Sequence, residues 1–149
     1  MEGLSVVCRA GARLCALGVE HVVEIMRPLP VRALADTPPF VRGVSVIRGE
    51  PVPVVSLACL LGGDDARATR FISVKGAGRP AALAVDEVLA VRTLPDDSRR
   101  ELSPLLGEAV PELVAVLGAI GDEPLLVLHS ARIVPASVWA ALGPERVDR

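Results

Sequence analysis

Side chains that can do acid–base or metal chemistry are few in this chain of 149 residues. The histidines are His21, which stands between Glu20 and Glu24, and His129, at the end of an apolar stretch. A metal site needs a cluster of histidine, cysteine or carboxylate ligands, and structural roles explain these two histidines better than metal ligation does. No tyrosine is present, so an enzyme would have very few acid–base groups to work with.

Familiar catalytic and nucleotide-binding motifs are also missing. Residues 43–47 begin like a Gly-x-Ser-x-Gly nucleophile elbow but end in isoleucine, and they lie inside a hairpin pattern. The only lysine, Lys75, lacks the upstream glycine of a phosphate-binding loop. The cysteines are odd in number and widely spaced, which favours buried apolar roles over a disulfide framework or a zinc site: Cys8, Cys15 and Cys59. We therefore expect no catalytic, cofactor-binding or metal site, with a small β-barrel enzyme as an open alternative.

Composition narrows the classes of partner. The net charge is −2, basic and acidic residues are interspersed, and aromatic residues make up 2% of the chain. Nucleic-acid binding is disfavoured because no basic stripe is present for a phosphate backbone and few rings can stack on bases. No apolar run reaches the roughly 18 residues that a membrane helix needs, so we expect no direct membrane insertion. The N-terminus lacks a basic and apolar leader, which predicts a cytoplasmic protein.

The elements that would position a binding site are short, valine-rich strands between glycine and proline turns. β-branched residues suit strands, and closely spaced turn signals predict an all-β barrel or sandwich. Four hairpins are expected, at residues 4–9 with 13–19, 43–47 with 52–57, 71–75 with 81–91, and 113–120 with 125–129. Helical segments are expected at residues 58–61 and 130–142. The polar loop at residues 62–68 is the best candidate for a boundary between two subdomains.

One stretch, residues 37–57, carries more information than the rest. It reads Thr-Pro-Pro-Phe-Val-Arg-Gly-Val-Ser-Val-Ile-Arg-Gly-Glu-Pro-Val-Pro-Val-Val-Ser-Leu. It resembles the signature of the CheW-like adaptor family, in which a proline and hydrophobic stretch leads to Gly-Val, then Arg-Gly, then a Pro-Val strand ending in leucine. Three further segments resemble elements of that family: residues 22–25, 83–88 and 117–122. The resemblance covers residues 4–142.

This resemblance implies a mainly β fold of two SH3-like five-stranded β-barrel subdomains with a shared core, and short helices in the connections and at the C-terminus. Residues 1–149 would form a single CheW-like domain. The implied function is that of a non-enzymatic scaffold, without a cofactor, that couples chemoreceptors to a CheA-type histidine kinase. The partners would be the signalling hairpin of a chemoreceptor (a methyl-accepting chemotaxis protein), held in an apolar groove between the barrels, and the regulatory domain of the kinase. Such an adaptor works in the cytoplasm at receptor arrays.

Valines are the first candidates for the protein-binding site. A receptor hairpin is helical and would lay an apolar stripe into a groove, so the groove walls should be apolar as well. We expect four residues to form these walls: Val22, Val85, Val88 and Val91. Each valine can equally be a plain core residue, and the sequence leaves this open.

Four more residues are candidates for protein binding on other grounds. Arg48 lies at a turn, from which its guanidinium can reach a carboxylate or carbonyl of a partner. Glu24 can pair with Arg48 inside the molecule or with a partner. Gly43 and Gly49 can permit close backbone approach or positive φ. The alternative for the two charged residues is a solvated surface position, and for the two glycines an ordinary turn.

The chain departs from the family pattern at three positions. Val46 stands where asparagine is usual, Ser56 where aspartate is usual, and Val116 where glycine is common. These replacements remove polar contacts or backbone freedom. A divergent adaptor that binds a receptor but not a kinase is therefore an open alternative.

Overall fold

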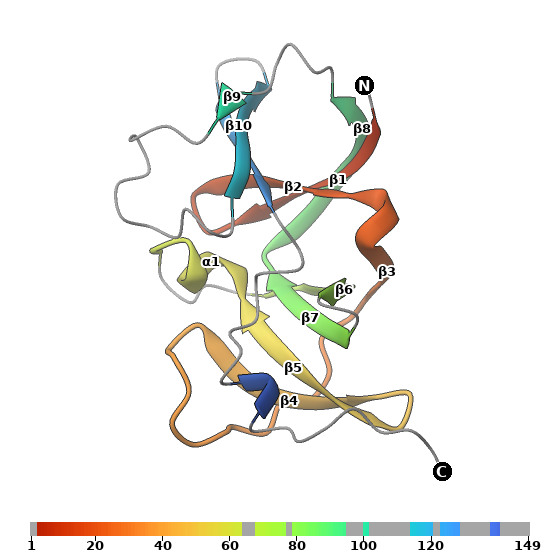
Figure 1. Ribbon diagram of the computed structural model, residues 1–149, viewed down its shortest axis with the longest axis vertical. Helices are drawn as coiled ribbons and strands as arrows, with labels where there is room; N and C mark the ends of the chain where they lie inside the picture. Colours follow the sequence, from red (N-terminus) through yellow and green to blue (C-terminus); the bar gives the residue numbers. More distant parts are fainter. Residues whose placement is uncertain are drawn as a thin grey trace.

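Two β-sheets follow one another along the long axis of the molecule (Figure 1). The computed structural model describes residues 3–63, 68–76, 79–94, 100–101, 114–120, 123–128 and 138–140. The first sheet has six strands, in the order β8–β1–β2–β11–β10–β9. Their bounds are Glu87–Leu94 (β8), Gly3–Ala10 (β1), Arg13–Gly18 (β2), Glu123–Leu128 (β11), Val114–Ile120 (β10) and Arg100–Glu101 (β9).

The second sheet has five strands, in the order β3–β6–β7–β5–β4. Their bounds are Val22–Met26 (β3), Arg70–Gly76 (β6), Arg79–Val85 (β7), Glu50–Ser56 (β5) and Val41–Ile47 (β4). Two short helices connect strands, the 3₁₀ helix η1 (Val19–His21) and the α-helix α1 (Leu57–Leu60). The hydroxyl of Ser56 caps α1 by accepting the N–H of Cys59 at 3.2 Å.

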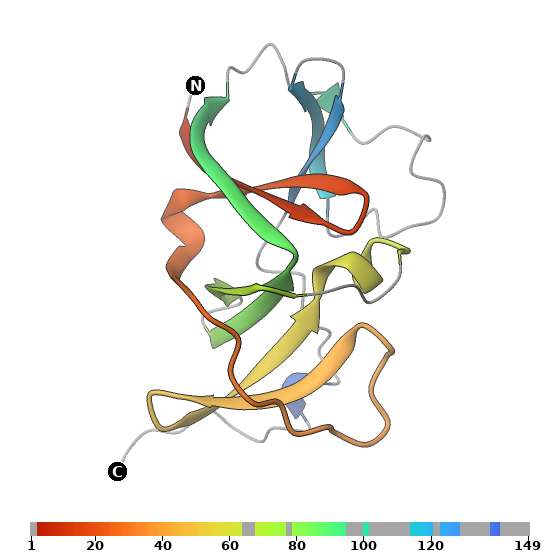
Figure 2. The same cartoon turned by 180° about the vertical axis from the view of Figure 1, so that it is seen from behind.

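The two sheets exchange strands. The β1–β2 hairpin of the first sheet is followed by β3, which pairs with β6 of the second sheet. The β6–β7 hairpin of the second sheet is followed by β8, which pairs with β1 of the first sheet. Each sheet also contains one parallel pair, formed by the second strands of its two hairpins. These pairs are β2 with β11 in the first sheet and β5 with β7 in the second. Each sheet is thus completed by a strand that continues from the other (Figure 2).

The described side chains form three core clusters, which explains why several strands read as continuous apolar runs. A central cluster takes side chains from both sheets and from α1, including Val6, Leu17, Val55, Leu57 and Leu83. One smaller cluster is made by strands of the first sheet, and another by strands of the second sheet with the segment before β4. Several strands pack against the central cluster on one face and against a smaller cluster on the other. Because both faces of these strands are buried, their sequences are apolar at successive positions.

The expected mainly β fold with two sheets and a shared core is confirmed. The four expected hairpins are present as β1–β2, β4–β5, β6–β7 and β10–β11. The second sheet has the expected five strands, whereas the first sheet gains a sixth, the two-residue strand β9.

The apolar stretch at residues 81–91 does not form the single long strand that its composition suggests. The chain bends at Asp86, which separates β7 from β8. The N–H of Asp86 donates to the carbonyl of Arg9 at 2.9 Å, and the carbonyl of Asp86 accepts a hydrogen bond from the Thr69 hydroxyl. The single-strand prediction is wrong because the two halves of this stretch pair in different sheets, which hydrophobic patterning does not reveal.

The chain passes between the sheets at η1 and again at Asp86. Residues 62–68, the expected boundary, lie between α1 and β6, and residues 64–67 of this loop fall outside the described residues. The helix α1 that precedes the loop contacts β5 and β7, and it also lies beside the β1–β2 turn, where a Cβ added at Gly11 would lie 3.3 Å from the Cβ of Ala58. The predicted boundary within this loop stays a prediction.

The expected C-terminal helix is described only at residues 138–140, which are helical. Val138 is buried in the central cluster, with 1% of its surface exposed. The guanidinium carbon of Arg79 lies 4.6 Å from the centroid of the Trp139 ring, which attaches this turn to the start of β7. The rest of the expected helix lies outside the described residues.

Candidate protein-interaction surfaces

An ion pair joins two of the predicted site residues, Glu24 and Arg48. Arg48 and Gly49 form the two-residue turn between β4 and β5, with φ of 55° and 83°. Positive φ at both positions fits the right-handed twist of a hairpin. Arg48 donates to Oε2 of Glu24 through Nη2 at 2.8 Å and Nε at 3.1 Å. This bond ties β3, at one edge of the second sheet, to the turn beside β4, at the other edge.

Gly43 allows a close approach of two backbone segments. Its φ is +142°, and a Cβ added there would lie 2.1 Å from the carbonyl oxygen of Arg32. Two hydrogen bonds of 2.8 Å, between the N–H and C=O groups of Arg32 and Val44, hold the segments together. The expectation that these glycines permit close backbone approach or positive φ is confirmed, because Gly43 shows both and Gly49 shows positive φ. Their role in protein binding stays a prediction.

The four predicted wall valines do not share one environment. Val85 is fully buried in the central cluster, so it stabilises the fold and offers no surface to a partner. Val22 and Val88 pack against the same cluster and are partly buried. Val91, on the edge strand β8, keeps 54% of its surface exposed. Of the four, Val91 is therefore the one best placed for a protein contact.

Sequence reasoning missed most of the apolar residues that are exposed around Val91. We define the β3–β8 apolar face as the exposed large hydrophobic residues of β1, η1, β3 and β8: Leu4, Val19, Val23, Ile25, Leu89 and Val91. In both ribbon views β8, η1 and β3 follow one another down the same side of the molecule (Figures 1 and 2). On β3 exposed and half-buried residues alternate, and its exposed positions are Val23 and Ile25. A polar face is usual for such an edge, so this pattern indicates a covered surface.

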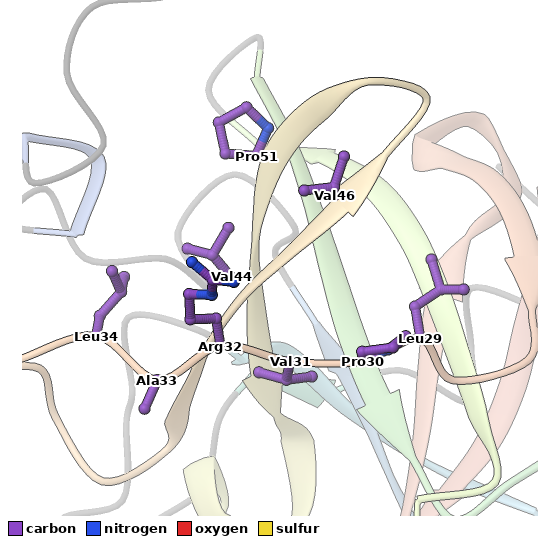
Figure 3. Close-up of a pocket in the computed structure, with 9 residues that line it drawn as sticks. All are labelled: Leu29, Pro30, Val31, Arg32, Ala33, Leu34, Val44, Val46 and Pro51. Carbon is purple, nitrogen blue, oxygen red and sulfur yellow. The ribbon is translucent and has the colours of Figure 1, made fainter.

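A second apolar surface is hollowed. The hairpin concavity has a volume of about 880 Å³ and lies between the segment before β4 and the β4–β5 hairpin (Figure 3). Its lining residues are Leu29, Pro30, Val31, Arg32, Ala33, Leu34, Val44, Val46 and Pro51. Val46 has the largest exposed fraction, 67%, of the large hydrophobic residues that the structure describes. Alternation along β4 predicts that this side chain faces outward, but only the structure shows that it faces a hollow.

Another ion pair fixes the first sheet. Nη1 of Arg9 lies 2.9 Å from Glu123, which places a charged contact between β1 and β11, across β2. The hydrogen bond from Arg9 holds the pKa of the Glu123 carboxyl below its ordinary value. Cys8 and Cys15 lie directly opposite each other in the β1–β2 register. Their mutual hydrogen bond and the burial of Cys15 raise the pKa of the Cys15 thiol.

Neither a metal cluster nor a membrane-spanning helix is seen in the described part of the chain. No group of three or more histidine, cysteine, aspartate or glutamate side chains is placed there to hold a metal ion. No helix among the same residues has the length and hydrophobicity to cross a membrane.

Comparison with known proteins decides the family. The family model for the CheW-like domain matches residues 5–137. The chain belongs to the CheW-like family. It is also 37% identical over 114 residues to protein FrzA of Myxococcus xanthus, an alignment that covers 72% of this chain and 70% of FrzA. CheW-like proteins are non-catalytic scaffolds of chemotaxis-type signalling, and this chain is one of them.

A solved structure supports the fold of this CheW-like chain. The crystal structure of the scaffolding protein TtCheW from Thermoanaerobacter tengcongensis superposes with a TM-score of 0.77. The match covers 87% of this chain and 85% of TtCheW, with 23% sequence identity. At this identity the likeness concerns the fold alone.

Proposed function

We propose that this CheW-like protein couples the signalling hairpin of a chemoreceptor to the regulatory domain of a CheA-type histidine kinase, in the cytoplasm at receptor arrays. The observation that carries the proposal is a pair of exposed apolar surfaces, the β3–β8 apolar face and the hairpin concavity. A scaffold for two partners needs two such surfaces, and exposed apolar patches on soluble domains commonly mark protein contacts.

The β3–β8 apolar face is the surface proposed for the receptor. A receptor hairpin presents apolar side chains along one face of a helix, and edge strands with exposed valine, leucine and isoleucine offer a matching surface. We therefore expect a helix of the receptor hairpin to pack along these strands.

The hairpin concavity is the surface proposed for the kinase. It is concave and mostly apolar, and it belongs to the second sheet (Figure 3). The Glu24–Arg48 ion pair connects the elements that carry the two surfaces, because Glu24 lies on β3 and Arg48 on the hairpin turn. A partner on either surface contacts an element that this pair holds in place.

A divergent adaptor that binds the receptor alone is the second candidate, and Val46 is the observation that favours it. Its apolar side chain is exposed in the hairpin concavity, where the family usually has a polar asparagine. The replacement of the usual aspartate by Ser56 is weaker support for lost kinase binding than the sequence suggested. Its hydroxyl caps α1, a role that aspartate fills equally well.

Parallel binding measurements test the proposal. A receptor signalling fragment and a kinase regulatory domain would each be titrated calorimetrically against the wild type, Val91→Asp and Val46→Asp. We expect Val91→Asp to weaken receptor binding at least tenfold and leave kinase binding unchanged, and Val46→Asp to do the reverse, since a charge buried in an apolar interface costs several times RT. Ala12→Asp, on the exposed β1–β2 turn, is the matched control.

The outcomes separate the candidates. Receptor binding without kinase binding selects the divergent adaptor. Failure of the folded wild-type protein to bind either partner refutes the coupling function.

A further inference from the structure

A second hollow enters the half of the fold built on the second sheet. It has a volume of about 380 Å³, and we call it the barrel pocket. Its lining residues are Pro28, Leu29, Val31, Arg42, Val54, Ala68, Phe71 and Ala84. Leu29 and Val31 also line the hairpin concavity, so the two hollows adjoin along the segment before β4.

The inner wall of the barrel pocket is apolar. Val54, Phe71 and Ala84 belong to the cluster of the second sheet and are 0%, 2% and 5% exposed. Ala84 lies directly opposite Phe71 in the β6–β7 register, so this wall places a single methyl group beside a ring. The volume lies within the range of roughly 300–1,000 Å³ that is common for ligand pockets.

A β-bulge lies beside the one charged residue among those that line this pocket, Arg42. In the β4–β5 register Val41 pairs with Val55 and Gly43 with Val54, so Arg42 has no opposite residue. Bulges can redirect side chains, and the exposed residue Arg42 at this bulge lines the pocket. Arg42 already has an interaction within the chain, and its five N–H donors allow a second acceptor to bind beside it.

The surroundings of the pocket are basic as well. Arg27, which precedes the lining residue Pro28, is exposed, and so is Arg32 in the adjoining concavity. Neither arginine is in an ion pair within the described part of the chain. An occupant with a negative charge next to its apolar part is therefore favoured over a neutral one.

We propose that the barrel pocket receives an apolar side chain with a neighbouring carboxylate, supplied by the kinase regulatory domain bound in the hairpin concavity. This inference rests on the proposed function. The apolar group fills the space beside Phe71 and Ala84, and the carboxylate binds Arg42. A partner residue is the occupant because the pocket adjoins the larger surface, and binding energy concentrates in buried anchors that fill such pockets.

The pocket can be tested without the kinase. N-acetyl-leucine carries an isobutyl group and a carboxylate, and we expect saturable methyl chemical-shift changes at Ala84 and Val54 when it is titrated. N-acetyl-leucinamide, which lacks the carboxylate, should bind about tenfold more weakly. Arg42→Gln should cause a similar loss, and Ala84→Leu, which fills the pocket, should abolish binding. Arg13→Gln and Ala12→Leu, at exposed positions of the β1–β2 hairpin, are the matched controls.

The kinase measurement then assigns the occupant. We expect Ala84→Leu and Arg42→Gln each to weaken binding of the regulatory domain at least tenfold, while receptor binding stays at the wild-type value. Folding of both variants would be checked by circular dichroism, and Arg42→Gln keeps the test valid if Ala84→Leu does not fold. If both variants fold and both bind the kinase domain with wild-type affinity, the inference is overturned, while the proposed function still stands. N-acetyl-leucine binding to a wild-type protein that binds no kinase domain overturns both the kinase assignment and the coupling function. Absence of N-acetyl-leucine binding, with kinase affinity unchanged in both variants, shows that the pocket takes no such group.

Discussion

Gly43→Ala should be far more damaging than alanine at another glycine with positive φ in the same hairpin. The new Cβ would lie 2.1 Å from the carbonyl oxygen of Arg32, and this contact is with backbone, which cannot rotate away. Either the segment before β4 moves off the strand or the bulge refolds. Both responses break the two hydrogen bonds between Arg32 and Val44.

The expected loss of stability follows from these contacts. A residue with a side chain forced into such a backbone conformation costs about 1–3 kcal/mol, and two broken backbone hydrogen bonds cost about 1 kcal/mol each. The free energy of unfolding should therefore fall by about 3–5 kcal/mol. Gly49→Ala is the matched control, because its φ is also positive but no atom lies within 4 Å of the added Cβ. Its cost should be only about 1 kcal/mol.

Urea unfolding followed by circular dichroism distinguishes these values. With a slope of about 2 kcal/mol per molar urea, the midpoint should fall by roughly 1.5–2.5 M for Gly43→Ala and about 0.5 M for Gly49→Ala. Amide exchange at Val44 should also speed up in the first variant alone. Equal midpoints for the two variants would refute the argument that close backbone approach, rather than φ, sets the requirement at Gly43.

The first-sheet ion pair, the core and the cysteines each allow a separate test. Because Arg9 lowers the folded pKa of Glu123, this carboxylate stabilises the fold above its unfolded pKa, and the contribution is lost as pH falls through the folded pKa. The difference in urea midpoint between wild type and Glu123→Gln should thus be present at pH 7 and vanish in strongly acidic buffer; a constant difference would contradict this. Leu83→Ala should cost about 2–5 kcal/mol in denaturation experiments and Val91→Ala under about 0.5, and similar costs would count against the assigned burial. Iodoacetamide with mass spectrometry should modify Cys59 first in the native protein, because the other two thiols are buried; equal rates would disprove this.

The hairpins were predictable because each is a local event. Turn residues and short valine-rich runs specify where the chain reverses, and β4–β5 with its Arg48–Gly49 turn follows directly from them. The pairing of Glu24 with Arg48 was predicted as one of three options, beside a contact with a partner and a solvated position, since charge alone does not fix the partner. The family signature added the second sheet and the shared core, which local patterns do not specify.

Other features depend on tertiary pairing, and the sequence could not supply them. Val85 and Val91 lie in the same apolar run, yet one is fully buried and the other is 54% exposed. The difference arises at Asp86, where the run leaves one sheet for the other. Likewise, no local signal shows that Ala84 pairs with Phe71 or that a bulge places Arg42 at the same pocket, because both facts depend on strand register.

The chain passes from the first sheet to the second at β3 and back to the first at β8, and this path determines what happens when the chain is cut. A break between Gly63 and Ala68 would leave β1 to β5 on one fragment and β6 to β11 on the other. Each sheet draws strands from both fragments, so neither fragment holds a whole sheet. The halves visible in space are therefore not the halves of the polypeptide. A nicked molecule would stay interlocked, and each fragment made alone would lack the strands that close it.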